Sequence, residues 1–199
     1  MFIPPCPTLE TESLRVRPLE MSDAEQLFAL WSDQRVHAVC GIDGLQSVKS
    51  IQSGLAYFIG LNEAGFYHKW ILELKHSGEM IGECELYPLR PQIRPWLEWA
   101  MGFSSKPEFW GRGLMMEAVA EVLDFAFTQT SAIRINADVL LDNERCKRFL
   151  IKNGFSLEGC QQQKIVSQGQ LVDSSHFALL KSSFTARSKE GVEHLVGVG

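Results

Sequence analysis

One segment carries the strongest structural signal in this chain: Pro107-Glu108-Phe109-Trp110-Gly111-Arg112-Gly113-Leu114-Met115-Met116-Glu117-Ala118. The apolar spacing that follows predicts a long amphipathic helix from Leu114, and the residues before the segment indicate the end of a strand. A glycine-bearing turn at a helix start presents free backbone amides and the positive end of the helix dipole. Because Gly111 and Gly113 let the backbone approach a ligand closely, the turn is a candidate phosphate site.

Two common nucleotide motifs do not fit this turn. The P-loop pattern G-x-x-x-x-G-K is absent from the sequence. A dinucleotide fingerprint would need a third glycine at position 116, which is occupied by Met116. The Gly-x-Gly pattern alone is therefore compatible either with a phosphate site or with an ordinary helix N-terminal turn.

Periodicity predicts a mixed α and β chain around the turn. Strands are expected at residues 8–19, 70–74, 80–86, 96–103, 133–141, 157–166 and 173–181. Helices are expected at about 22–39, within 40–65, from 114, and at about 143–153. The spacing of Ser22 and Glu25 predicts a capping box, and Glu117 is expected on the outward face of its helix.

Length and composition favour one globular domain. The chain has 199 residues, 45% of them apolar, and we expect a single domain over 8–184 with a disordered tail at 185–199. The 5 cysteines form no C-x-x-C pair, so neither a disulfide framework nor a metal site is expected. No apolar run is long enough to cross a membrane, and the N-terminus is a poor signal peptide, so we expect a cytoplasmic protein.

The charge is unevenly distributed. The net charge is −5, and residues 1–105 hold 8 Lys or Arg against 13 Asp or Glu. Such a balance argues against direct binding of nucleic acid. If the first half faces the substrate, the acidic excess favours a cation such as an amine; a solvated surface is the equally acceptable alternative.

Several further motifs occur in a consistent order along the chain. They are residues 9–19, Gly78-Glu79-Met80-Ile81-Gly82, Gly102-Phe103 before Pro107, the glycine turn through Glu117-Ala118, and Asn143-x-x-Cys146 through Gly154-Phe155. Over about 8–184 the chain resembles the GNAT superfamily of acyl-CoA-dependent N-acetyltransferases. The resemblance is strongest to its branch of ribosomal-protein N-terminal (alanine/serine) acetyltransferases.

This resemblance implies an α+β fold with a bent, mixed, mostly antiparallel sheet of about seven strands, flanked by helices and splayed between the fourth and fifth strands. It implies acetyl-CoA as cosubstrate, with the pantetheine in the gap and no metal. The cofactor-binding residues carried over by position are Phe103, Ser105, Gly111, Arg112, Gly113, Leu114, Met115 and Asn143. The basic side chains Arg145, Lys147, Arg148 and Lys152 either meet the ribose phosphate or form a solvated helix face.

The catalytic residues are less clear than the cosubstrate site. Many relatives use a Tyr as acid where this chain has Leu150, and the ribosomal branch has a Ser where this chain has Cys146. Cys146 is therefore our candidate acid, with a buried spacer as the alternative. The same branch is thought to use a Glu as base where this chain has Ile165.

We take Glu98 as the candidate base, with Glu83 and Glu85 as rivals and a water chain as a further alternative. The aromatic residues considered for the acceptor pocket are Trp31, Trp70, Trp96, Trp99 and His176.

The resulting hypothesis is an acetyl-CoA-dependent N-acetyltransferase that transfers acetyl directly to a primary amine. The acceptor is either a protein N-terminal α-amine or a small amine. The alternatives are an acyl-CoA-binding sensor with little catalysis and a nucleotide-binding oxidoreductase. A monomer or a homodimer is expected, with no membrane partner.

Overall fold

The computed structural model describes residues 4–40, 47–92, 95–167 and 169–185. It contains one eight-stranded sheet with the order β1-β2-β3-β4-β5-β6-β8-β7. The strands are β1 (Leu9–Glu10), β2 (Leu14–Pro18), β3 (His68–Leu74), β4 (Met80–Pro88), β5 (Glu98–Ser105), β6 (Arg134–Leu140), β7 (Ser156–Ser167) and β8 (Gln170–Leu180). Neighbouring strands are antiparallel except β5 and β6, which are parallel. The expected single strand over 8–19 is in fact the antiparallel pair β1 and β2, which accounts for the additional strand.

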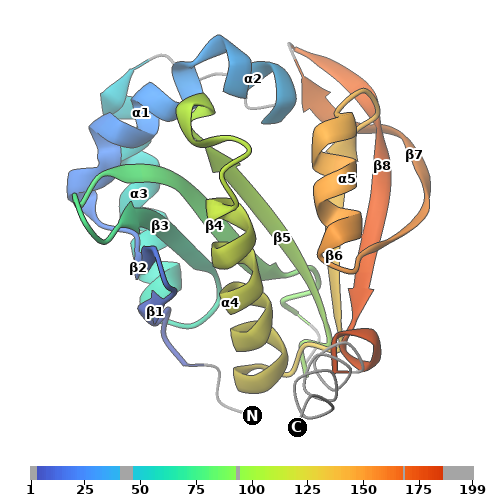
Figure 1. Cartoon of the computed structure of the whole chain (residues 1–199). Helices are drawn as coiled ribbons and strands as arrows, with labels where there is room; N and C mark the ends of the chain where they lie inside the picture. The colour runs from blue at the N-terminus through green and yellow to red at the C-terminus, as the bar shows by residue number, and fades with distance from the viewer. Residues whose placement is uncertain (1–3, 41–46, 93–94, 168, 186–199) are drawn as a thin grey trace, which may run out of the picture.

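Helices cover both faces of the sheet (Figure 1). They are α1 (Ala24–Ser32), α2 (Gln34–Cys40), α3 (Val48–Glu63), α4 (Leu114–Gln129) and α5 (Glu144–Lys152), with 3-10 turns at Met21–Asp23 and Pro107–Phe109. Helices α1 and α3 pack against one face, and α4 packs against the other through the larger core. None of the helices among the described residues is both long and apolar enough to cross a membrane.

The first helical region differs from the expectation in two respects. The predicted helix over 22–39 is interrupted at Asp33, whose extended backbone (ψ 120°) separates α1 from α2. The predicted capping box of Ser22 and Glu25 is wrong. Asp23 takes that role instead, because its Oδ2 accepts from the Glu20 amide (2.8 Å) while Arg17 pairs with it (2.6 Å).

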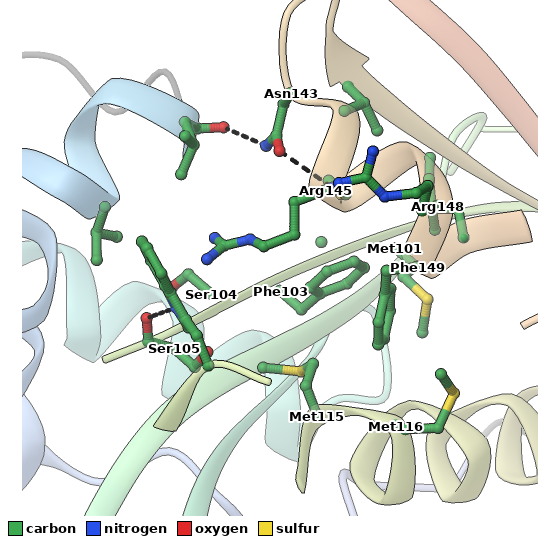
Figure 2. Close-up of a pocket in the computed structure, with 18 of the residues that line it drawn as sticks. Met101, Phe103, Ser104, Ser105, Met115, Met116, Asn143, Arg145, Arg148 and Phe149 are labelled. Atoms are coloured by element: carbon green, nitrogen blue, oxygen red, sulfur yellow. Dashed lines mark hydrogen bonds between the residues drawn. The ribbon is translucent and has the colours of Figure 1, made fainter. Parts of the chain in front are cut away.

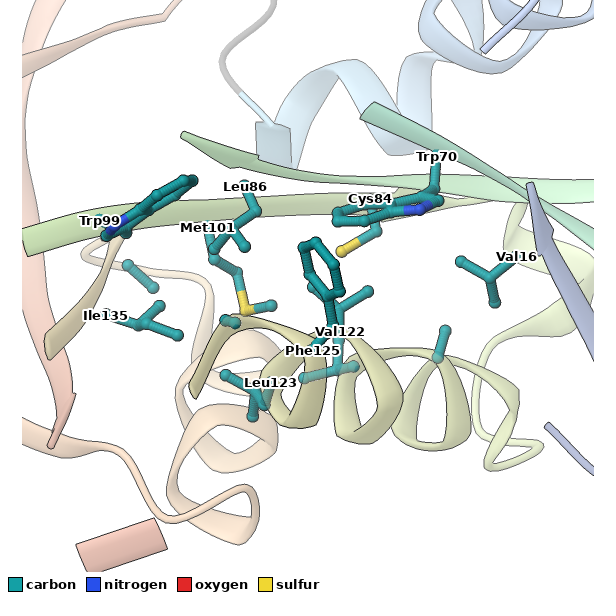
Figure 3. Packing of buried hydrophobic residues seen from close by; sticks show 14 of the residues in the cluster. Val16, Trp70, Cys84, Leu86, Trp99, Met101, Val122, Leu123, Phe125 and Ile135 are labelled. Carbon is teal, nitrogen blue, oxygen red and sulfur yellow. The ribbon is translucent and has the colours of Figure 1, made fainter. Parts of the chain in front are cut away.

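The core between the sheet and α4 contains most of the tryptophans (Figure 3). Trp70 and Trp99 are fully buried there, and Trp96 is nearly so. The indole nitrogens of all three donate to backbone carbonyls. These three residues, considered above for the acceptor pocket, are therefore core residues, as their apolar surface favours.

Helix α4 is fixed to the β1–β2 turn by its first-turn carboxylate. Glu117 accepts from the hydroxyl of Thr11 (2.8 Å) and from the amide and hydroxyl of Ser13 (3.1 Å each). Glu117, expected on the outward face of its helix, is half-buried because these three donors hold it against the β1–β2 turn. Burial raises the pKa of Glu117, but the three hydrogen bonds outweigh burial and lower the pKa.

The sheet splays between β5 and β6, as expected for the fourth and fifth predicted strands. The two strands pair from Glu98↔Arg134 to Ala100↔Asn136 and no further, although β5 continues to Ser105 and β6 to Leu140. Beyond this point β6 pairs with β8 and β5 with β4. The fold therefore opens a gap in the middle of the sheet.

Candidate active site

A cavity of about 590 Å³ occupies the gap between β5 and β6 (Figure 2). Its walls come from β4, β5, the glycine turn and the start of α4 on one side, and from β6 and α5 on the other. Val36 and Val39 of α2 and Ile165 of β7 complete the lining. The cavity thus runs from the helix α4 N-terminus to the acidic residues of β4.

The glycine turn forms one end of the cavity. Gly111 and Gly113 have φ of +76° and +82°, a backbone conformation in which side chains are rarely tolerated. A Cβ at either glycine would meet no protein atom within 4 Å, so the turn borders open space. Gly113 is the N-cap of α4, and its carbonyl accepts from the Met116 amide (2.9 Å). The backbone amides at the start of α4, before Met116, are therefore oriented as in an anion site.

The structure divides the five residues expected to hold a pyrophosphate. Gly111, Gly113 and Met115 line the cavity. Arg112 and Leu114 instead line a second hollow on the other side of the turn. Their backbone amides still belong to the same helix start. The predicted contacts of Arg112 and Leu114 with the pyrophosphate therefore involve their backbone amides and not their side chains.

The splayed edge of β5 forms the floor of the cavity. Phe103 and Ser105, expected to contact pantetheine, both line it. The Ser105 carbonyl accepts from the indole nitrogen of Trp110 (2.9 Å), which fixes the glycine turn to the end of β5. The Phe103 ring packs on the Phe149 ring of α5, with 4.9 Å between centroids, so the two walls of the cavity meet at its base.

Asn143 lies at the start of α5 and faces the cavity (Figure 2). Its Oδ1 accepts from the Cys146 amide (3.1 Å), and its Nδ2 donates to the Val39 carbonyl (3.4 Å). The carboxamide therefore caps α5 and connects it to α2. A contact between Asn143 and a ligand stays a prediction.

Three of the four basic side chains of α5 line the cavity. They are Arg145, Arg148 and Lys152. The Arg145 guanidinium stacks over the Trp110 ring at 3.4 Å from its centroid. Lys147 is not among the lining residues and pairs with Glu144 (2.7 Å). The wall opposite the glycine turn is therefore cationic, and Lys147 lies outside it.

Cys146 lines the cavity on the first turn of α5. Burial raises the pKa of its thiol to about 11, although the charge of Arg145 opposes the shift. Leu150 and Ile165, where the resemblance implied a phenol and a carboxylate in other family members, also line the cavity. At these three positions the cavity thus presents one protonated thiol and two apolar side chains.

The far end of the cavity contains carboxylates of β4. Glu83 and Glu85 both line it, with Lys69 of β3 between them. Each carboxylate is 2.8 Å from the Lys69 ammonium. Tyr67 donates to Glu85 (2.5 Å), and Ser104 donates to Glu83 (2.7 Å).

Glu98, the base candidate from sequence, is not brought to the cavity. It is absent from the lining residues and lies where β5 and β6 still pair. Its carboxylate accepts from Asn136 (3.0 Å) and forms ion pairs with Arg90 (3.3 Å) and Arg134 (3.7 Å). A catalytic role for Glu98 therefore has no support from its position.

Sequence reasoning missed Lys69, Tyr67 and Asp138 as site residues. Asp138 lines the cavity, and its Oδ1 lies 2.6 Å from Nδ1 of His176 on the neighbouring strand β8. A usable signal existed, because Lys69 and Glu85 are register partners in adjacent strands. The strand prediction began at 70 and thus left the lysine outside.

Comparison with known proteins agrees with this geometry. Residues 13–156 match the family described as Acetyltransferase (GNAT) domain. The uncharacterized N-acetyltransferase YoaA of Bacillus subtilis (strain 168) is 29% identical over 175 residues, which cover 88% of this chain and 97% of YoaA.

Two solved structures show the same fold. The ribosomal-protein-S5-alanine acetyltransferase from Vibrio fischeri has a TM-score of 0.75 and 21% identity, covering 89% of this chain and 98% of its own. The spermidine N-acetyltransferase from Vibrio cholerae, in complex with CoA and spermine, has a TM-score of 0.74 and 18% identity, covering 87% and 98%. The chain belongs to the GNAT acetyltransferase family and is an N-acetyltransferase.

Proposed function

We propose that this enzyme transfers an acetyl group from acetyl-CoA directly to a primary amine that arrives as a cation. The observation that carries the proposal is the single cavity of the splay, which has an anion-binding turn and cations at one end and carboxylates at the other. Acetyl-CoA supplies the acetyl group as a thioester. An amine acceptor must lose a proton, and the acidic end provides groups that accept one.

The residues present fit the cosubstrate. The amides of Gly111 to Met115 would hold the diphosphate, since the helix dipole and the open Cβ positions favour an anion there. Arg145, Arg148 and Lys152 would balance the remaining phosphate charge. The unpaired edge of β5 at Phe103 and Ser105 would bind pantetheine as an additional strand does, and Asn143 would meet its amide.

We assign the proton-accepting role to Glu85 in place of Glu98. Glu85 lines the cavity, whereas Glu98 is held by Arg134 and Asn136 outside it. Burial raises the pKa of Glu85, but the charge of Lys69 and hydrogen bonds from Lys69 and Tyr67 outweigh burial and lower the pKa. Glu85 is therefore ionised at neutral pH and attracts an ammonium.

Cys146 would stabilise the departing thiolate by a hydrogen bond. Its pKa of about 11 keeps the thiol protonated at neutral pH. The ordinary thiol pKa is about 8.5, so complete proton transfer from Cys146 to a thiolate is uphill. We therefore expect Cys146→Ala to reduce turnover less than loss of Glu85.

The test is an acetyl-CoA assay with peptides and small amines, read by release of free thiol. Glu85→Gln should lower kcat/KM by about 100-fold or more, as for loss of a general base, while CoA binding is unchanged. Glu98→Gln is the matched control and should lower kcat/KM much less. Silence of the parent enzyme with every amine would overturn the proposal, and a larger effect at Glu98 would return the base to that residue.

A further inference from the structure

Lys69 is a buried cation at the acidic end of the cavity, and the reaction proposed above uses it only as a charge beside Glu85. Its residue is only 4% exposed. The ammonium lies 2.8 Å from both Glu83 and Glu85 and under the rings of Trp31 (5.2 Å) and Phe58 (5.9 Å). Its backbone is fixed as well, since the Lys69 amide donates to Asn62 Oδ1 (2.9 Å) and its carbonyl accepts from Asn62 Nδ2 (3.0 Å).

Such an arrangement is unfavourable as a purely structural device. Burial of an ion pair costs desolvation that the attraction between the charges often fails to offset, and apolar residues commonly replace it without loss. On the same face of the sheet, under α1 and α3, Ile71 and Met80 belong to the second core, and a separate ion cluster joins Arg17 to Asp23 and Glu73. The position of Lys69 next to the cavity therefore points to a role in the reaction.

The geometry separates the two oxygens of Glu85. Its Oε2 receives both Lys69 (2.8 Å) and the Tyr67 hydroxyl (2.5 Å). Among the described residues, none donates a hydrogen bond to Oε1. This oxygen lies over Gly102 of β5, only 2.7 Å from the position that a Cβ on Gly102 would take. One oxygen is thus anchored, and the other is available at the splay.

We propose that Lys69 is a positioning residue that holds Glu85 ionised with Oε1 directed to the acceptor amine. This inference rests on the proposed function, because it assigns a support to the same base. Lys69 also neutralises Glu83, so two neighbouring carboxylates can remain charged at once. The site is left with the uncompensated charge that attracts a single ammonium.

The sign of the pH effect follows from the groups around Glu85. Lys69 of β3 and Tyr67, the residue before β3, face it. Glu83 and Tyr87 lie beside it on β4, and the charge of Asp138 on β6 acts on Tyr87. Helices α1 and α3 contribute the uncharged rings above Lys69. Without the cation, two carboxylates that share one site cannot both ionise easily, so one pKa rises. The acid limb of kcat/KM should then move to higher pH.

The experiment is the pH profile of kcat/KM for parent, Lys69→Met and Lys69→Arg, each shown to be folded by CoA-induced thermal protection. We expect Lys69→Met to lose about 10- to 100-fold at pH 6 and to recover most of it above pH 8, with unchanged CoA affinity. Lys69→Arg keeps the charge and should restore the acid limb. Tyr67→Phe removes one hydrogen-bond donor to Glu85 and no charge, so the acid limb of its kcat/KM profile should shift less than that of Lys69→Met.

A second variant covers failure to fold. Lys69→Met/Glu83→Gln removes one charge of each sign, and burial of the remaining Glu85 should still move its acid limb upward. A loss of activity that is equal at every pH in these variants would show a structural role and overturn the inference.

A readout without turnover separates this inference from the proposed function. Titration of the glutamate side-chain carboxyl carbons by NMR reports the ionisation of Glu85 directly, assigned through Glu85→Gln. In Lys69→Met the Glu85 titration should shift to higher pH. An unchanged titration overturns the role of Lys69 even if the parent is active, and an inactive parent with a shifted titration overturns the proposed function alone.

Discussion

The two ends of the cavity are built in different ways. The glycine turn and the start of α4 lie within residues 107–118, so one short segment supplies the backbone of the proposed anion site. The acidic end takes Lys69 from β3, Glu83 and Glu85 from β4, and Asp138 from β6. A cosubstrate site that is built from the backbone of one segment depends little on which side chains surround it. An acceptor site that is built from side chains on several strands changes with each substitution.

If the two ends are separable, the largest effect should come from moving Glu85 without touching the turn. In Gly102→Ala the new Cβ would lie 2.7 Å from Glu85 Oε1 and 3.0 Å from its Cγ, so the carboxylate must turn away. We expect kcat to fall by about 100-fold with CoA affinity nearly unchanged, measured by thiol release and calorimetry. Gly60→Ala in α3, where a Cβ meets nothing within 4 Å, is the control and should leave kcat unchanged. Unaltered kcat in Gly102→Ala would count against Glu85 as base.

The converse substitution damages the turn and spares the acidic end. Gly113→Ala places a side chain at φ +82°, which costs about 1–2 kcal/mol and should weaken CoA binding by about 10-fold. Gly78→Ala, at φ +69° in the β3–β4 turn, should lower the melting temperature similarly but leave CoA affinity intact. Equal CoA affinity in both variants would contradict the assignment of the turn to the diphosphate.

A smaller effect distinguishes the two faces of α5. Arg148→Ala should raise the KM for acetyl-CoA about 3-fold at low salt and less at high salt, because a partly exposed charge contributes under about 1 kcal/mol. Lys147→Ala, on the neighbouring residue outside the cavity, should leave that KM and its salt dependence unchanged. The comparison is a titration of acetyl-CoA at two ionic strengths. An equal change of this KM in both variants would contradict a contact between Arg148 and a phosphate of acetyl-CoA.

The same difference explains what could be predicted from the sequence. The turn and α4 follow from contiguous patterns, and the GNAT fold with its splay, which the resemblance implies, is confirmed. The site at the acidic end depends on which residues face each other across strands. This strand register cannot be deduced from any single segment of the sequence. Glu85 was accordingly only a rival of Glu98, although Glu85 opposes Gly102 and Glu98 opposes Arg134.

Other errors have local physical causes. The cap at Glu20 and Asp23 was assigned two residues too late, because the half-buried Arg17 determines which carboxylate turns inward. Trp70, Trp96 and Trp99 were considered for the acceptor pocket since their type suits a pocket, yet their indole nitrogens donate to backbone carbonyls in the core. The expected domain bounds of 8–184 stay a prediction. The expected tail at 185–199 lies outside the described residues except for Thr185, whose hydroxyl donates to the Lys181 carbonyl (2.9 Å).

The attachment of Glu117 to the β1–β2 turn has a consequence for how the proposed cosubstrate site binds its ligand. Since Thr11 and Ser13 hold the first turn of α4 before any ligand arrives, docking of the thioester substrate orders little new backbone and loses little entropy. The lowered pKa of Glu117 means that this restraint is complete above the ordinary range for a glutamate and weakens as acid protonates it. The attachment of α4 to the β1–β2 turn should therefore weaken only as the pH falls below the ordinary pKa of a glutamate.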